Sequence, residues 1–510
     1  MRTFLVGGGG RESALGLRLG ESSELSVLAP HENPSLKRLA EDTGGTLTVG
    51  DICDPEVAAR SAKAAHADLA VVSSDAPIAA GVVDALISAG IPTMGATQKA
   101  AEIEWNKGFS RQVVDIVEPS ANPRYHHVKT PEEIRSAIAD LCDVPVVVKP
   151  QGLTGGKGVK VMGYHLDTYD DAVRYAESLV AKNDFPIIEE RIDGIEFTIQ
   201  AITDGIATFF PPATYDYPYR YDGDTGPGTG GMGSFSCNSA ILPFIEQDEY
   251  ETACSIMQKV IDYLGSTGRK FSGVLNGGFF VSRKGLTVIE FNARFGDPEC
   301  MNIMSLMESN WVETVQSIAA REFRPATVRL RDEASVVVYL VAPTYPNPSA
   351  KPTRFNVDLA AAERMQTRVY FSSTVPVPGG YEGVGASRAV AFAATNKDLS
   401  VARNMAYAAI EEAVEGPLEF RRDIAGTQYL DKLIARRQEW LLLYLTHLRE
   451  YAAPRIGPRL LVLLSKQAHL PDPPDTSMKY HMKIRGLTDP SQTFRSFCER
   501  EHPGLDVDGV

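Results

Sequence analysis

The first hundred residues alternate short aliphatic or β-branched runs with stretches that have helical periodicity. Strands are expected over 3–6, 25–29 and 67–73, and helices are expected to begin near Arg11 and Ile78. Such alternation is typical of βαβ units, in which helices connect and cover the strands of a parallel sheet. No other feature limits the fold as strongly, because it restricts the N-terminal part of the chain to an α/β architecture.

The size and charge of the chain narrow its possible functions. At 510 residues it exceeds what one hydrophobic core supports, so three or more domains are expected. A net charge of −14 argues against general binding to nucleic acids or anionic membranes. Six scattered cysteines predict neither a disulfide framework nor a zinc site. Because no signal peptide or membrane-spanning run is evident, a cytoplasmic location is expected.

The first predicted strand enters a glycine-rich turn, Gly7 to Gly10, at the start of a helix. Backbone N–H groups at such a helix N-terminus can bind an anion. A dinucleotide site is the alternative, but the turn lacks the usual glycine spacing and no ribose-binding carboxylate is evident. Arg11 and Glu12 could also form only a salt bridge in the first helical turn. The turn therefore indicates anion binding without identifying the ligand.

The segment Val288–Glu299 has the most informative chemistry. Glu290, Asn292 and Arg294 alternate with apolar residues, and residues two apart on a strand face the same side. A carboxylate, an amide oxygen and a guanidinium would then point into one cleft. Oxygen ligands suit Mg²⁺ or Mn²⁺, and arginine suits a phosphate. The alternative is an ordinary strand with a polar face.

A second phosphate-binding signal lies between the predicted strand 144–149 and another apolar run. Residues 151–161 contain four glycines and two lysines, which fits a hairpin loop that closes over phosphates. It is not a Walker A loop, because Gly158 follows Lys157 where serine or threonine is needed, and a strand follows instead of a helix. A plain glycine hairpin remains the alternative.

The remaining segments are less specific. Residues 187–198 predict two strands around a turn, and the Tyr-, Gly- and Pro-rich stretch 213–236 predicts a functional loop, with a disordered loop as the alternative. A helix near 248–264 and strands over 273–281 and 286–292 follow. An amphipathic helix over 429–450 precedes a polar tail.

Together these motifs resemble the phosphoribosylamine–glycine ligases (glycinamide ribonucleotide synthetases), an ATP-grasp family of purine synthesis. The resemblance covers roughly residues 1–426. It rests on Gly7–Ala14, Ser73–Gly81, Val147–Val159, Gly223–Gly233, Ile289–Glu299 and Phe420–Ile424.

The resemblance implies a multidomain α/β fold. The expected parts are an N-terminal parallel-sheet substrate domain (1–100), an ATP-grasp lid (101–195), an ATP-grasp core (196–327), a small C-terminal α+β domain (328–426) and a helical or irregular extension (427–510).

The chemistry implied is ATP-dependent ligation. The carboxylate of glycine would attack the γ-phosphate of ATP, and the amine of 5-phosphoribosylamine would then attack glycyl phosphate. The products would be glycinamide ribonucleotide, ADP and phosphate. The implied partners are these small molecules and Mg²⁺ or Mn²⁺, with no nucleic acid and no membrane, in a monomer or small homo-oligomer.

The resemblance also assigns roles to single residues. It implies ATP contacts at Lys107, Lys149, Gly155, Gly156, Lys157, Gly158, Glu189, Glu190, Ile192 and Glu196. It implies substrate contacts at Gly9, Gly10, Arg11, Asp75, Pro77, Asp216 and Arg294. It implies metal ligands at Glu290 and Asn292, and catalytic roles for Arg294 and Lys157. Without the resemblance, Lys107 could be a surface lysine, and Glu189 and Glu190 could be solvated strand residues.

Some positions depart from the family pattern. Residues 215–220 keep Asp216 but lack the usual histidine and lysine, Arg220 is at best shifted, and Gly228 stands where asparagine is usual. An ATP-grasp ligase with another amino acid or sugar amine is therefore an alternative. A nucleotide-binding regulator without turnover is a third hypothesis, although Glu290, Asn292 and the two lysines argue against it.

Overall fold

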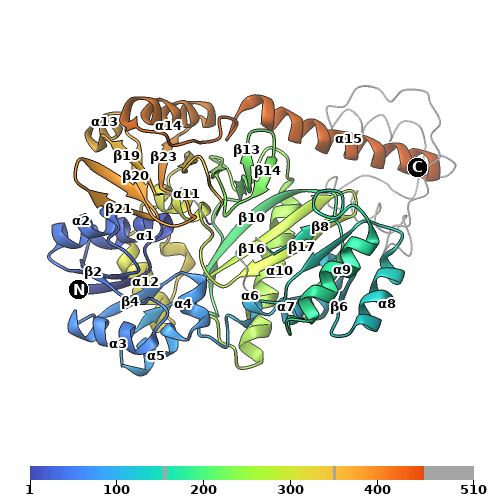
Figure 1. Cartoon of the computed structure of the whole chain (residues 1–510), viewed down its shortest axis with the longest axis horizontal. Coiled ribbons are helices and arrows are strands. Elements are labelled where there is room, and N and C mark those ends of the chain that lie inside the picture. Colours follow the sequence, from blue (N-terminus) through green and yellow to red (C-terminus); the bar gives the residue numbers. More distant parts are fainter. Residues whose placement is uncertain (153–157, 348–351, 453–510) are drawn as a thin grey trace, which may run out of the picture.

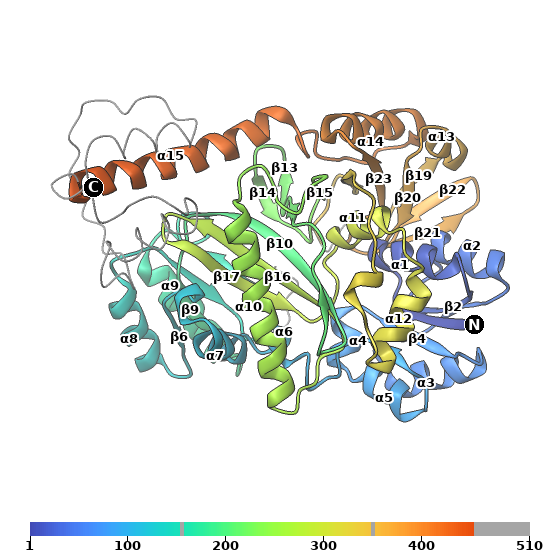
Figure 2. The same cartoon turned by 180° about the vertical axis from the view of Figure 1, so that it is seen from behind.

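The computed structural model describes the backbone of residues 1–152, 158–347 and 352–452, and the side chains of these ranges up to residue 440. The molecule is elongated, with the N-terminal and C-terminal domains stacked at one end and the lid at the other (Figures 1 and 2). In the described part, no helix is long and apolar enough to cross a membrane.

The N-terminal domain contains the parallel sheet that the alternation of runs predicts. All of its neighbouring strands are parallel, in the order β3-β2-β1-β4-β5. Its elements are β1 Arg2–Val6, α1 Gly10–Gly20, β2 Glu24–Ala29, α2 Pro34–Thr43, β3 Leu47–Val49, α3 Pro55–Ala64, β4 Leu69–Val72, α4 Asp75–Ala79, α5 Val82–Ser88 and β5 Thr93–Met94.

Local sequence explains where these helices begin. In α2 and α3 a proline occupies the first turn, and the side chains of Asn33 and Asp54 accept hydrogen bonds from free backbone N–H groups. Helix α1 is capped differently, because Glu12 reaches back and its Oε2 accepts from Gly9 N at 2.8 Å.

The lid is a four-stranded antiparallel sheet in the order β6-β9-β7-β8, with a hydrophobic core of its own. Strands β7 and β8 pair as the predicted hairpin, whose tip, residues 153–157, lies outside the described residues. The elements are α6 Glu102–Trp105, α7 Lys107–Val117, η1 Pro119–Ala121, β6 Tyr125–His127, α8 Pro131–Leu141, β7 Val146–Lys149, β8 Lys160–Val161, α9 Tyr169–Val180 and β9 Ile187–Glu190.

A nine-stranded sheet forms the centre of the molecule, with the path β17-β16-β10-β12-β15-β18-β23-β20 and β11 beside β10. Helix α10 crosses the face of β10 and β16 (Figure 2). The elements are β10 Gly194–Thr203, β11 Thr208–Phe209, β12 Thr214–Asp216, β15 Gly233–Ser236, α10 Gln247–Ser266, β16 Gly273–Ser282, β17 Gly285–Asn292, β18 Ala334–Leu340, β20 Arg368–Phe371 and β23 Val390–Asn396.

The sheet continues across the domain boundary predicted at residue 327, because β15 pairs with β18. That boundary remains a prediction. The other elements of this end are α11 Glu299–Leu306, α12 Trp311–Ala320, η2 Pro325–Thr327, β19 Thr353–Val357, α13 Leu359–Arg364, β21 Thr374–Val377, β22 Gly380–Gly383, α14 Leu399–Ala413 and β24 Val414–Glu415. A second sheet here has the order β21-β22-β19-β24.

The glycine-rich stretch 213–236 differs from the predicted loop. It consists of β12, a hairpin of β13 (Tyr219–Tyr221) and β14 (Thr225–Gly228), and β15. Gly223, Gly226 and Gly231 have φ values of 69°, 83° and 97°, which glycine adopts without steric cost. Gly223 and Gly231 therefore make the tight turns between the short strands, whereas Gly226 lies within β14.

The predicted C-terminal amphipathic helix is α15 (Thr427–Ala452). It leaves the C-terminal domain, passes the β13–β14 hairpin and extends beside the lid (Figures 1 and 2).

Candidate active site

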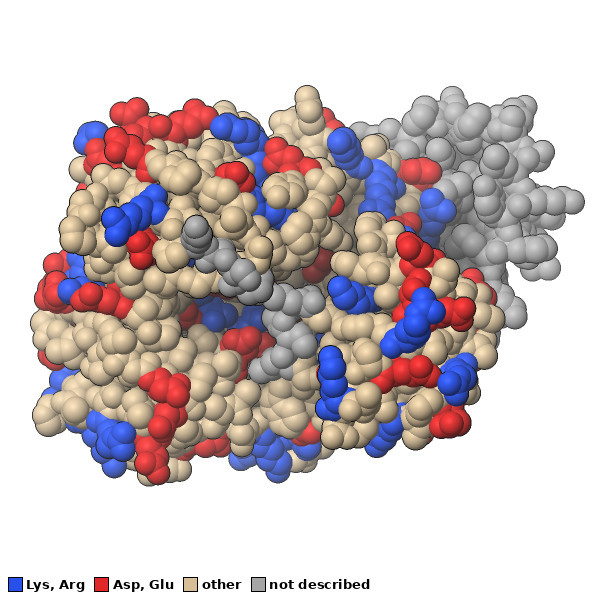
Figure 3. All heavy atoms as spheres, viewed as in Figure 1, with Lys and Arg blue, Asp and Glu red and all other residues tan. Residues whose placement is uncertain are grey.

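Two adjoining cavities lie where the N-terminal domain, the lid, the central sheet and the C-terminal domain meet. The first has a volume of about 410 Å³ and the second about 340 Å³, and Lys149, Glu189, Glu196 and Asp216 line both. Figure 3 shows a hollow near the middle of one face, in which basic and acidic side chains lie together. The predicted site residues that line the larger cavity are Arg11, Asp75, Lys107, Lys149, Glu189, Glu196, Asp216, Glu290, Asn292 and Arg294.

The smaller cavity is bordered by the connection between β9 and β10. Glu190 and Ile192, two of the residues for which the resemblance implies ATP contacts, line it together with Leu433 and Arg436 of helix α15. Glu190 accepts hydrogen bonds from the Lys284 amine at 2.8 Å and from the Arg124 backbone N at 3.0 Å.

Several predicted residues do not line either cavity. Gly10 packs against Tyr339, and a Cβ at this position would lie 2.2 Å from the tyrosine hydroxyl. Gly9 donates its N–H to Glu12, and Pro77 is buried in α4. All three nevertheless stand beside Arg11 or Asp75 in the chain, and their contact with substrate stays a prediction.

The predicted glycine loop is only partly described. Gly158 accepts a hydrogen bond from the Tyr175 hydroxyl at 2.6 Å, which attaches the end of the loop to α9. Gly155, Gly156 and Lys157 lie outside the described residues.

The alternation at the end of β17 has the predicted geometry. Phe291 and Ala293 are buried, whereas Glu290, Asn292 and Arg294 face the larger cavity. The Arg294 Nη2 donates to Asn292 Oδ1 at 3.0 Å.

The donors around β17 suit a magnesium or manganese ion. The register places Asn276 of β16 opposite Asn292, and Asn276 Oδ1 is buried without a donor among the described residues. The described residues contain no group of three or more His, Cys, Asp or Glu that could hold a metal. A metal here would therefore take oxygen ligands from Glu290, Asn292 and Asn276 and complete its shell with water or ligand oxygens.

A buried charge cluster underlies the cavity. Arg111 contacts both oxygens of Glu189, with Nε–Oε1 at 2.6 Å and Nη2–Oε2 at 2.9 Å, and the Lys149 amine lies 2.8 Å from Oε2. Burial would raise the pKa of Glu189, but the Arg111 and Lys149 cations outweigh it and lower the pKa to about 2. Glu189 therefore stays ionised and fixes Lys149 at the cavity wall.

Sequence reasoning missed Arg111, although a signal was present. It lies four residues after Lys107 on α7, so both side chains face the same side of one helix. Lys107 donates to the carbonyl of Gly152 at 2.9 Å, and burial lowers its pKa, as does the like charge of Lys149.

Carboxylates gather on the other side of the larger cavity. Burial, together with the neighbouring Glu290 and Glu299, raises the pKa of Glu196 to about 7. Burial also raises the pKa of Asp216, as do Glu299 and Glu196, and burial and Asp297 raise the pKa of Glu299. This side can therefore hold protons or bind a cationic group.

A second missed residue, Arg388, supplies positive charge next to these acids. It lies two residues before the start of β23, 3.0 Å from Asp297 Oδ2, and donates to Gly231 O at 3.0 Å. Arg220, in contrast, points away from both cavities and donates to Tyr345 O at 3.0 Å and Glu419 Oε2 at 2.6 Å. The larger cavity thus has a basic side chain from the C-terminal domain, Arg388, and none from residues 215–220.

Arg11 forms the N-terminal wall of the larger cavity. Its guanidinium pairs with Glu12 at 2.8 Å and donates to Phe295 O and to Ser74 Oγ, both at 3.0 Å. The salt bridge considered for Arg11 and Glu12 is therefore present, and it holds Arg11 at the cavity beside Asp75.

Comparison with known proteins identifies the family. Residues 1–104 match the model for the phosphoribosylglycinamide synthetase N domain, and residues 105–300 match the model for its ATP-grasp (A) domain. A phosphoribosylamine–glycine ligase from Pyrococcus abyssi is 39% identical over 86% of this chain and 98% of its own length. One from Methanopyrus kandleri is 38% identical over 86% and 98%.

The fold agrees with these matches. The crystal structure of a phosphoribosylamine–glycine ligase from Thermotoga maritima superposes with a TM-score of 0.69 at 23% identity, covering 83% of this chain and all of that one. A biotin carboxylase from Campylobacter jejuni superposes with a TM-score of 0.60 at 13% identity, covering 86% and 95%. The multidomain α/β architecture expected from the sequence is confirmed, and the chain belongs to the phosphoribosylglycinamide synthetase family.

Proposed function

We propose that the chain ligates glycine to 5-phosphoribosylamine at the expense of ATP, giving glycinamide ribonucleotide, ADP and phosphate. One observation supports this above all: cations from α7, β7 and the end of β17 meet oxygen donors for a metal in a cavity that adjoins a second one, lined by the β9–β10 connection. The named activity of the relatives agrees with this arrangement.

In the first step a carboxylate oxygen of glycine attacks the γ-phosphorus of ATP. The bond from phosphorus to the β,γ-bridging oxygen breaks, ADP leaves, and glycyl phosphate forms. Lys107, Lys149 and Arg294 face the region where charge accumulates on phosphoryl oxygens, so they stabilise the transition state electrostatically. A metal held by Glu290 and Asn292 would supply further positive charge there.

In the second step the sugar amine attacks the acyl carbon of glycyl phosphate. The C–N bond forms, the bond from carbon to the phosphate oxygen breaks, and phosphate leaves while the amine loses a proton. Arg11 and Asp75 line the N-terminal side of the cavity, where the sugar and its phosphate would bind. The carboxylates Asp216 and Glu299 lie where the glycine ammonium group would need negative charge.

The lid would keep water from glycyl phosphate. Its β7–β8 hairpin adjoins the cavity through Lys149 and Val159, and we expect the glycine loop at its tip to close over the phosphates. Excluding water protects the acyl phosphate from hydrolysis and strengthens the electrostatic contacts inside the site.

The alternative, another amino acid or sugar amine, was suggested by the substituted 215–228 segment. Arg388, paired with Asp297, lines the same side of the cavity, so that side still carries a cation beside its carboxylates. Phosphate release measured with ATP, glycine and freshly generated phosphoribosylamine tests the proposal directly. Release that requires a different amino acid would favour the alternative.

A pair of variants tests whether turnover uses the β17 residues. Glu290→Ala and Asn292→Ala should each abolish phosphate release while leaving the circular dichroism spectrum unchanged. Glu132→Ala, which removes an exposed carboxylate of the lid helix α8, is the control and should retain full activity. Near-normal activity in either β17 variant would refute the metal assignment. If the chain were a nucleotide-binding regulator without turnover, the wild-type protein itself would release no phosphate.

A further inference from the structure

The β13–β14 hairpin borders both cavities but, within the described ranges, is not part of a larger sheet. Among the described residues its two strands pair only with each other. Yet Pro218, Thr229 and Gly230 at its root line the larger cavity, and Tyr219 and Asp224 line the smaller one. An isolated two-stranded hairpin is marginally stable in water, so its position depends on the groups that hold it.

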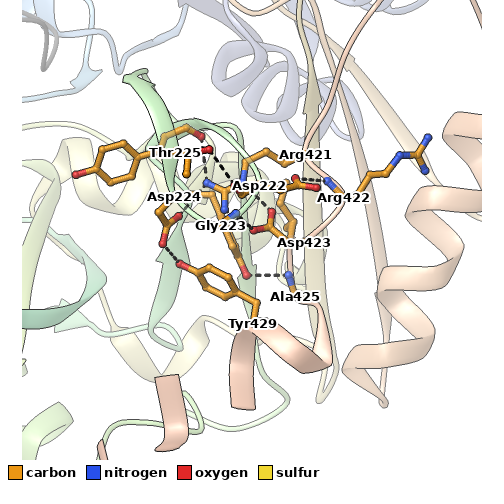
Figure 4. A network of polar contacts seen from close by, with 12 residues as sticks. Asp222, Gly223, Asp224, Thr225, Arg421, Arg422, Asp423, Ala425 and Tyr429 are labelled. Atoms are coloured by element: carbon orange, nitrogen blue, oxygen red, sulfur yellow. Dashed lines mark hydrogen bonds and ion pairs between the residues drawn. The ribbon is translucent and has the colours of Figure 1, made fainter. Parts of the chain in front are cut away.

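Arg421 is the main group that holds the hairpin (Figure 4). Its side chain is fully buried, and its Nη1 donates to Tyr219 O at 3.1 Å and to Asp224 Oδ1 at 3.0 Å. Its Nε and Nη2 donate to the two oxygens of Asp423 at 2.8 and 2.6 Å. The guanidinium also lies over the ring of Tyr217, 4.8 Å from its centroid.

Further contacts tie the turn of the hairpin to the same C-terminal segment. Gly223 N donates to Asp423 Oδ2 at 2.8 Å, and the Tyr429 hydroxyl donates to Asp224 Oδ2 at 2.5 Å. The hydroxyls of Tyr429 and Tyr215 are 2.7 Å apart. We call Arg421, Asp423 and Tyr429 the C-terminal clamp.

The hairpin root in turn supports the acceptor side of the cavity. Thr229 donates its N–H and its hydroxyl to Pro218 O, at 2.7 and 2.9 Å, which closes the root. The carbonyls of Gly230 and Gly231 accept hydrogen bonds from Arg388, which lines the cavity. A shift of the hairpin would therefore move both the cavity wall and the partners of Arg388.

We propose that the C-terminal clamp positions the side of the cavity that receives glycine and phosphoribosylamine. The clamp fixes the hairpin, and the hairpin sets the shape of this side of the cavity through Thr229, Gly230 and Arg388. The proposal rests on the proposed function for the identity of these substrates. The clamp residues line neither cavity, so they act through the hairpin and not by touching a ligand.

Tyr429→Phe and Asp224→Asn are suitable test variants, because each keeps the volume of the side chain. The first removes the hydroxyl that contacts Asp224 and Tyr215, and the second removes the charge that Arg421 and Tyr429 contact. Arg422→Ala is the matched control. Arg422 is the neighbour of Arg421 and has the same charge, but its side chain is 65% exposed, pairs with Glu411 and points away from the hairpin.

In steady-state assays we expect both test variants to raise the KM for glycine and for phosphoribosylamine by about tenfold, since small displacements of binding groups are costly. The value of kcat should change much less, and Arg422→Ala should behave as the wild type. A merely structural role would lower kcat through loss of folded enzyme and leave both KM values unchanged, and that result would overturn the proposal.

Combining the two substitutions adds a check. Tyr429 and Asp224 share one hydrogen bond, and each also has a contact of its own, to Tyr215 and to Arg421. The double variant should therefore lose less than the sum of the two single losses. Fully additive losses would contradict a shared clamp.

Hydrogen exchange gives a readout that does not depend on turnover. Amides of residues 217–231 should lose protection in Tyr429→Phe and Asp224→Asn but not in Arg422→Ala, and unchanged protection would overturn the clamp. If the wild type forms no glycinamide ribonucleotide, the proposed function fails, while the exchange experiment still decides whether the clamp holds the hairpin.

Discussion

The buried cluster of Glu189, Arg111 and Lys149 makes a quantitative prediction. In Glu189→Gln the shape of the side chain is kept, but two cations lose the anion between them. Glu189 and Arg111 are each only 4% exposed, so solvent cannot replace the lost charge. The substitution should therefore destabilise the chain by far more than the loss of a surface ion pair would.

The magnitude follows from the pKa of Glu189. A pKa lowered from 4.5 to about 2 corresponds to about 3 kcal/mol of stabilisation of the folded chain. This agrees with the roughly 3–5 kcal/mol that removal of one partner of a buried ion pair costs. Because the carboxylate has the lower pKa in the folded state, the stabilisation is complete above pH 4.5 and is lost as the pH falls towards 2.

The assay is guanidinium unfolding followed by circular dichroism, with the free energy taken from midpoints at equal m value. Glu177→Gln is the control, because Glu177 and its partner Arg135 are 33% and 62% exposed and the loss should be about 1 kcal/mol or less. The decrease in the free energy of unfolding caused by Glu189→Gln should be roughly half as large at pH 3. Equal penalties for the two variants, or a penalty independent of pH, would refute the reasoning.

Other expectations concern activity, packing and pH. Lys149→Ala should raise the KM for ATP by about tenfold because a charge-assisted contact is lost, whereas the exposed Lys182→Ala should not. Gly10→Ala should cost about 1–3 kcal/mol in unfolding assays, because its Cβ would overlap the hydroxyl of Tyr339; Gly265→Ala on α10, with open space around it, should be neutral or stabilising. Calorimetry should show ATP binding that is lost with EDTA and restored by Mg²⁺ or Mn²⁺, and binding unaffected by EDTA would contradict the metal site. Activity should rise from mildly acid to mildly alkaline pH, since the attacking sugar amine must be unprotonated; a flat profile would mean that another step limits the rate.

Sequence patterns were sufficient to predict the parts of the fold and of the site that depend on local periodicity. The alternation of Glu290, Asn292 and Arg294 predicts their common orientation, and the run 151–161 predicts the β7–β8 hairpin. Both depend on residues within a few positions of one another, where backbone geometry alone decides which side chains meet.

Patterns failed where the contact joins distant parts of the chain. Arg111 reaches Glu189 across 78 positions, and Arg388 reaches Gly230 across 158. Nothing in the residues around Arg388 indicates which cavity wall it will meet, because its position depends on how β23 joins the central sheet. The many glycines of 213–236 predict a loop, because they mask the short strands there. Strands β12 and β15 form through pairing with β10 and β18, and β13 and β14 through pairing with each other.

The pairing of β15 with β18 has a consequence for dividing this protein into pieces. A fragment that stops at residue 327 would leave the buried strand Gly233–Ser236 without its outer neighbour. Free backbone groups on such an edge recruit strands from other molecules and lead to aggregation. Fragments for biophysical work should therefore end beyond Asn396, and a ligand-binding piece made from the first two thirds of the chain should be insoluble unless the missing strands are supplied during folding.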